Sequence, residues 1–109
     1  MTSAPHRPRI DSRVLADAAE MIRVLGHPLR LRIVECLEGR ERSVSDLQDA
    51  LRATQSAVSQ QLARMRSAGI VRGRREGSSV WYSIADRRVV RMLGCLRGCE
   101  LPPGRRGAN

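Results

Sequence analysis

The sequence contains no lysine, so all 20 of its basic residues are arginines, against 11 acidic residues. It has no apolar run of about 18 residues, which excludes a membrane-spanning helix. Residues 1–9 are polar and lack the apolar segment of a signal peptide. The three cysteines are an odd number, which argues against a fully paired disulfide framework and indicates reduced thiols in a cytoplasmic protein.

Positive charge is what the sequence has in excess. The formal net charge is +9 and the isoelectric point is about 11.4, which predicts an acidic partner such as DNA, RNA or an anionic membrane surface. The base composition of the genome is the alternative explanation for so much arginine. A chain of 109 residues forms one small domain and buries only about two-thirds of its unfolded surface, so a dimer interface would complete its core.

Apolar residues at helical spacing predict five helices in a domain at 11–100, between flexible tails at 1–10 and 101–109. The second helix is expected to turn Arg30, Arg32 and Glu35 outward. The first and last helices have more apolar residues than one small core needs, so they are candidates for the dimer interface. The expected helices run from Asp11 or Ser12 to about Leu25, from Pro28 to Gly39, from the Ser43–Asp46 capping box to about Leu51, from Thr54 to Gly69, and from near Asp86 to about Gly98.

The fourth helix has the features of a DNA-reading helix. Its apolar stripe is Val58, Leu62 and Met65, and its opposite face is polar without a single acid. A short helix and a tight turn precede it, as in a helix-turn-helix. Amides, hydroxyls and an arginine on such a face suit the base edges of a DNA major groove. The candidate residues on that face are Gln55, Ser56, Ser59, Gln60 and Arg64.

After Gly69 the apolar period changes from helical spacing to alternation, which predicts two strands at 70–75 and 79–84 joined by a turn at 76–78. Arg72, Arg74 and Arg75 crowd the first strand and its tip. A basic hairpin after a helix-turn-helix is typical of a wing that grips phosphates or the adjacent minor groove. The expected fold is therefore mostly α with a two-stranded antiparallel wing, a winged helix-turn-helix.

From Leu25 to about Ile84 the chain resembles the ArsR–SmtB family of bacterial winged-helix repressors. The resemblance lies in five blocks that occur in the family's order, at 25–34, 43–47, 55–62, 68–77 and 80–84. It implies a homodimer paired through its first and last helices, bound to a near-palindromic DNA operator and released by an effector. It also implies that Gln55, Ser56, Ser59 and Gln60 read bases, whereas the phosphate contacts of the arginines follow from charge and geometry.

Two effector sites of the family are altered in this sequence. Ser43 and Ser45 stand where the metal-sensing branch carries cysteines, so the thiolates that soft metals require are absent. On the last helix Asp86 fits the opening of a second metal site, but Arg88 stands where a histidine ligand is expected. The resemblance therefore leaves the identity of the effector open.

Cys36, Cys95 and Cys99 are the remaining candidates for sensing. Two of these thiols could be oxidised or bridged by sulfur, as in the reactive-sulfur sensors that the resemblance includes, although the cysteine positions differ from that pattern by one or two residues. Three thiolates could instead bind a thiophilic ion such as arsenite, mercury or cadmium. The cysteines could also be small buried side chains without a sensing role. The effector would then be nickel or another metal ion held by non-classical ligands, or the signal would come from a sensory partner protein.

We therefore predict a DNA-binding transcriptional repressor. The alternative from a second class is an architectural protein that coats DNA without sequence preference. An enzyme such as a thiol oxidoreductase is not expected, because Cys95 and Cys99 are separated by three residues and not by the two of the usual redox motif.

Overall fold

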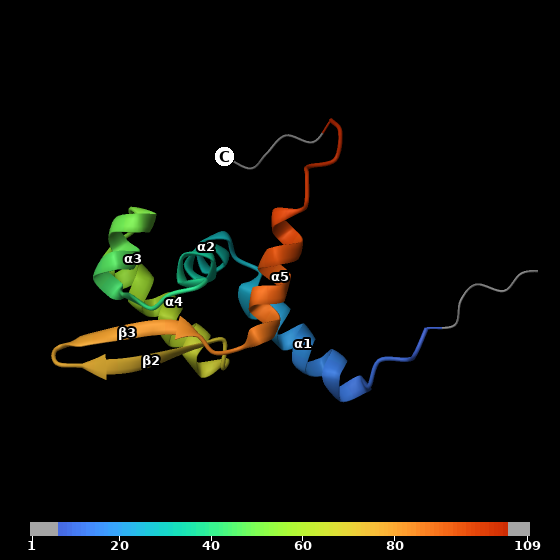
Figure 1. The fold of residues 1–109 in the computed structure, drawn as a ribbon, viewed down its shortest axis with the longest axis horizontal. Helices are drawn as coiled ribbons and strands as arrows, with labels where there is room; N and C mark the ends of the chain where they lie inside the picture. The colour runs from blue at the N-terminus through green and yellow to red at the C-terminus, as the bar shows by residue number, and fades with distance from the viewer. Residues whose placement is uncertain (1–6, 105–109) are drawn as a thin grey trace, which may run out of the picture.

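The computed structural model describes residues 7–104 and contains five helices and a small sheet. Residues 7–10 and 101–104 contain no helix or strand, while 1–6 and 105–109, the outer parts of the expected tails, lie outside the described residues. None of the described helices combines the length and apolar character needed to cross a membrane. The elements are α1 (Ser12–Leu25), α2 (Pro28–Leu37), β1 (Arg42–Ser43), α3 (Val44–Leu51), α4 (Gln55–Ser67), β2 (Val71–Glu76), β3 (Ser79–Ile84) and α5 (Arg87–Arg97). The hairpin of β2 and β3 projects to one side of the helices (Figure 1).

The helices begin where short polar side chains cap them, as the sequence predicts. The Asp11 carboxylate accepts a hydrogen bond from the backbone N–H of Arg13 at 2.8 Å, and the Thr54 hydroxyl accepts one from that of Ala57 at 3.1 Å. Ser43 and Asp46 form the expected capping box. These bonds satisfy amides of the first helical turn that have no partner within the helix. The local sequence thus fixes the helix starts.

The sheet has three strands and not the expected two, in the order β1-β3-β2. Both pairings are antiparallel: Arg42 lies opposite Tyr82 in one, and Gly73 lies opposite Tyr82 in the other. The two-residue strand β1 is too short to show any alternation, so its pairing with β3 has no signal in the sequence. The hairpin turn is also tighter than predicted, since Glu76 pairs with Ser79 and the turn is Gly77 and Ser78 alone. Gly77 has φ +63°, which a glycine adopts readily.

The core lies where α2, α3 and α4 meet the base of the hairpin. The apolar stripe of α4 is buried as predicted, with Val58, Leu62 and Met65 at most 1% exposed. Helix α1 contributes only its C-terminal part to this core, through Met21, Val24 and Leu25. The remaining turns of α1 therefore extend beyond the core.

The outer faces of α1 and α5 carry most of the exposed large apolar side chains. The N-terminal end of α5 meets α1 (Figure 1), where Arg88 of α5 pairs with Asp17 of α1 at 2.7 Å. Ile22, the most exposed of the large apolar residues within a helix, is 59% exposed. The apolar residues that the sequence analysis found in excess on these helices are therefore exposed to solvent in the single chain. The exposed residues on the two helices are Val14, Leu15, Ile22, Val90 and Leu96.

Candidate nucleic-acid interface

Helix α4 presents one polar, acid-free face to solvent. Its four N-terminal polar residues Gln55, Ser56, Ser59 and Gln60 are all exposed, and we call them the recognition surface. The Gln60 amide donates a hydrogen bond to the Ser56 hydroxyl at 3.4 Å. Because the opposite side of α4 is anchored in the core, this surface has a fixed direction. Its donors and acceptors match those of base edges.

The turn between α3 and α4 holds the two helices in a helix-turn-helix. Arg52 adopts the left-handed conformation with φ 52°, the single positive φ of a residue other than glycine among residues 7–104. The backbone N–H of Ala53 then donates to the carbonyl of Gln48 at 3.3 Å. The chain is thereby reversed within three residues, so that α4 starts close to the end of α3. The expected placement of α4 as the second helix of this motif is confirmed.

Arg30 orients α4 from the inside, whereas the sequence pattern placed it on the outer face of α2. Its side chain is half-buried and donates from Nε to Oε1 of Gln61 at 2.7 Å, and from Nη1 to the carbonyl of Val24 at 2.7 Å. One guanidinium therefore joins the end of α1, the start of α2 and the middle of α4. Because the hydrogen-bond partner Gln61 is 31 residues away, the apolar spacing of α2 gives no sign of it. The prediction that Arg30 points outward is therefore wrong.

Positive charge extends along α4 from the recognition surface. Arg64 is exposed and lines an open cavity of about 410 Å³ together with Arg23 and Arg30. Among the described residues Arg64 takes part in no ion pair. Its guanidinium thus remains available to a phosphate.

The wing places its three arginines on two faces. Arg72 and Arg74 lie opposite Ser83 and Trp81 and share one face, while Arg75 lies opposite Val80 on the other. Arg72 donates to the Ser83 hydroxyl at 3.4 Å. Within residues 7–104 neither Arg72 nor Arg75 forms an ion pair, but Arg74 forms two. The three arginines therefore differ in whether their guanidinium groups are already paired with a carboxylate.

This arrangement has close counterparts among known proteins. The family described as bacterial regulatory protein, arsR family, matches residues 27–72. The chain is 39% identical over 90 residues to the transcriptional repressor SmtB of Mycobacterium tuberculosis, a match that covers 82% of this chain and 67% of that repressor. This chain belongs to the ArsR family. The resemblance seen in the sequence blocks is confirmed.

Solved structures agree with this ArsR-family assignment. HlyU from Vibrio cholerae superposes with a TM-score of 0.76 at 32% identity, over 80% of this chain and 95% of HlyU. A homodimeric winged helix-turn-helix DNA-binding domain from Mycobacterium bovis superposes with a TM-score of 0.70 at 29% identity, over 79% of this chain and 80% of that domain. The ArsR-family chain is thus a winged helix-turn-helix transcriptional repressor of the DNA-binding class.

The three cysteines of this ArsR-family protein are free thiols and differ in exposure. Cys36 on α2 is half-buried, whereas Cys95 and Cys99 are exposed. Burial raises the pKa of the Cys36 thiol above its ordinary value, an effect that the nearby Arg42 opposes. Cys99 donates from Sγ to the carbonyl of Cys95 at 3.3 Å. In the chain between residues 7 and 104, no three His, Cys, Asp or Glu side chains gather in a group that could hold a metal ion.

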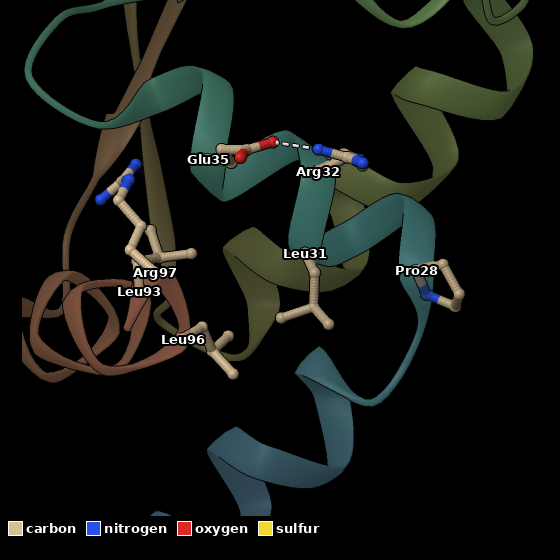
Figure 2. Close-up of a pocket in the computed structure, with 7 residues that line it drawn as sticks. All are labelled: Pro28, Leu31, Arg32, Glu35, Leu93, Leu96 and Arg97. Carbon is tan, nitrogen blue, oxygen red and sulfur yellow. Dashed lines mark hydrogen bonds and ion pairs between the residues drawn. The ribbon is translucent and has the colours of Figure 1, made fainter. Parts of the chain in front are cut away.

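The C-terminal ends of α2 and α5 approach each other; Cys36 lies on α2 and Cys95 on α5, whereas Cys99 lies two residues beyond the end of α5 at Arg97. Arg97 of α5 forms an ion pair with Glu38, two residues after Cys36. Between the two helices lies a cavity of about 330 Å³ (Figure 2), with Leu31, Leu93 and Leu96 as apolar lining. The structure therefore brings the thiol-bearing ends of these helices into one region. The cavity is also lined by Pro28, Arg32, Glu35 and Arg97.

Proposed function

We propose that this ArsR-family repressor binds an inverted-repeat DNA operator as a homodimer and releases it when an effector acts on α2 and α5. The exposed, acid-free recognition surface of α4 carries the DNA part of this proposal. In the proposed complex the recognition surface reads base edges, while Arg64, Arg72 and Arg75 contact phosphates. Arg74 has a different expected role, because two carboxylates already hold its guanidinium.

The exposed apolar faces of α1 and α5 support a dimer paired through these helices. Several large exposed apolar side chains on two helices that meet are candidates for a protein contact, and the homodimeric Mycobacterium bovis domain has the same fold. A two-fold dimer would present two α4 helices to successive major grooves. The operator half-sites should then lie about one helical turn apart, roughly 10 base pairs.

Base reading by α4 predicts that Gln60→Ala and Ser59→Ala each relax the sequence preference of the protein. Each lost base contact should cost about 1–3 kcal/mol on the preferred sequence and little on other duplexes. The measurement is selection of bound sites from random duplexes, followed by affinities for the selected and a scrambled site. Ser67→Ala is the matched control, because Ser67 is also an exposed serine of α4 but lies at its C-terminal end.

A wild-type protein that binds selected and scrambled duplexes with equal affinity would contradict this function and favour an architectural role. Unchanged preference in Gln60→Ala and Ser59→Ala, together with a sequence-specific wild type, would place base reading on other residues. The first result tests whether the protein is a sequence-specific repressor, and the second tests which residues read the bases.

The cysteines support sensing at the adjacent ends of α2 and α5. In the proposed response two thiols lose two protons and two electrons to an oxidant such as diamide and form one S–S bond. With tetrasulfide as the oxidant, one of its sulfane sulfur atoms is instead inserted between the two thiol sulfurs through two S–S bonds, and a second is reduced to hydrogen sulfide. The bond would move α5 relative to α2. This movement would change the angle between the two α4 helices, so that both no longer fit successive grooves.

We expect that treatment with diamide or sodium tetrasulfide releases the wild-type protein from its operator, and that Cys36→Ser prevents the release. Cys95→Ser and Cys99→Ser identify which thiol of the last helix takes part. The measurement is fluorescence anisotropy of labelled operator, repeated with arsenite and cadmium as thiophilic ions. Equal release of wild type and all three variants would remove the cysteines from the mechanism and favour other metal ligands or a sensory partner protein.

A further inference from the structure

Arg74 of the wing is held by two carboxylates. Its Nε and Nη2 donate to the two oxygens of Glu41 at 3.1 and 2.8 Å, and Nη1 donates to Glu76 at 2.5 Å. The pair with Glu41 is bidentate, the geometry in which a guanidinium binds a carboxylate or a phosphate most strongly. Glu41 and Glu76 therefore use three of the five N–H donors of Arg74, including the Nε and Nη2 edge that would bind a DNA phosphate in the bidentate geometry.

The contact with Glu41 also crosses the sheet. Arg74 lies on β2, whereas Glu41 immediately precedes β1, and the central strand β3 separates the two. By the register, Arg74 shares a row with Trp81 and Ser43. The Arg74 side chain thus reaches over β3 to the segment before β1, and it ties the outer strand of the wing to the helical body.

The charges of the three groups do not favour a phosphate. One guanidinium and two carboxylates give the Arg74 cluster itself a net negative charge, and Arg72 on the same face is the further cation that acts on Glu41. Hydrogen bonds from Arg74 lower the pKa of Glu41, so Glu41 stays ionised at neutral pH. A phosphate that binds the Nε and Nη2 edge of Arg74 would have to displace Glu41, and it would still lie close to Glu76. Arg75, on the other face of β2, meets no such obstacle.

We propose that Arg74 is a positioning residue of the wing, and that Glu41 and Glu76 withhold its charge from DNA. This inference rests on the proposed DNA binding and reassigns one arginine within it. The consequence is a weaker sequence-independent attraction, because the affinity for phosphates grows with the number of cations that contact them. The two acids thereby leave a larger share of the binding energy to the recognition surface.

Salt dependence of binding to a random-sequence duplex tests this inference, since each phosphate contact adds about 0.9 to the slope of log K against log salt. Arg75→Ala should reduce the slope by about 0.9 for each protomer bound, whereas Arg74→Ala should leave the slope unchanged. Glu41→Gln should free the Nε and Nη2 edge of Arg74 for a phosphate, while Glu76 stays on Nη1, and should therefore make the slope steeper and the binding tighter. The double variant Glu41→Gln/Arg74→Ala should return the slope to the wild-type value, which assigns the gain to Arg74.

A reduced slope in Arg74→Ala equal to that of Arg75→Ala would overturn the inference, as would an unchanged slope in Glu41→Gln. Failure of the proposed function has another signature, because the wild type would then bind selected and scrambled duplexes with equal affinity or would not bind DNA at all. Urea unfolding of each variant confirms that the domain remains folded. A merely structural role of Arg74 would change the unfolding midpoint without the gain of slope in Glu41→Gln.

Discussion

Replacing Ile22 by glutamate is expected to abolish specific operator binding without unfolding the single chain. Ile22 lies on the outer face of α1 and is 59% exposed, so the core does not depend on it. In the proposed dimer its side chain would be buried against the partner, where an unpaired carboxylate is costly. The dimer should therefore dissociate. A monomer engages one half-site only, so the operator affinity should fall toward the non-specific value, by about 10³-fold or more.

Sedimentation equilibrium measures the dimer and fluorescence anisotropy measures operator binding for this variant. Ile22→Leu is the matched control, because it keeps an apolar side chain of the same size at the same position and should retain both properties. Circular dichroism should show unchanged helix content in both variants. An Ile22→Glu protein that stays dimeric and binds the operator normally would exclude this face of α1 from the interface.

Leu47→Ala is expected to lower the free energy of unfolding of the domain strongly. Leu47 is fully buried and is the one buried residue of α3, so it anchors the first helix of the helix-turn-helix to the core. Truncation of a buried leucine to alanine removes apolar contacts and leaves a cavity, at a cost of about 2–5 kcal/mol. Small domains are stable by only about 5–15 kcal/mol. The variant should therefore unfold at a much lower urea concentration and lose DNA binding as a result.

The control for this substitution is Leu101→Ala, which makes the same chemical change at a residue that is 60% exposed. Its free energy of unfolding should stay within about 0.5 kcal/mol of the wild type. Equal stability of the two variants in urea unfolding would show that α3 is not held through Leu47. The orientation of α4 would then depend on its own buried stripe, the Arg30 contacts and the turn.

The sequence by itself determined the helices, the hairpin, the family and the polar face of α4. Caps such as Asp11, Thr54 and Asp86 act on amides two or three residues away, and the apolar period of a helix is also local. Both kinds of signal depend only on residues that are a few positions apart in the sequence. The predicted helix starts therefore agree with the structure to within about one residue.

The tertiary structure alone decided which side chains are available to a partner. Strand β1 exists only because β3, about 40 residues later, pairs with it. The partners of Arg30 and Arg74, at Gln61 and Glu41, are likewise 31 and 33 residues distant. A pattern read along the chain records charge and period but not long-range partners. The sequence therefore identified a basic wing, while only the fold showed that one of its arginines is already bound by acids.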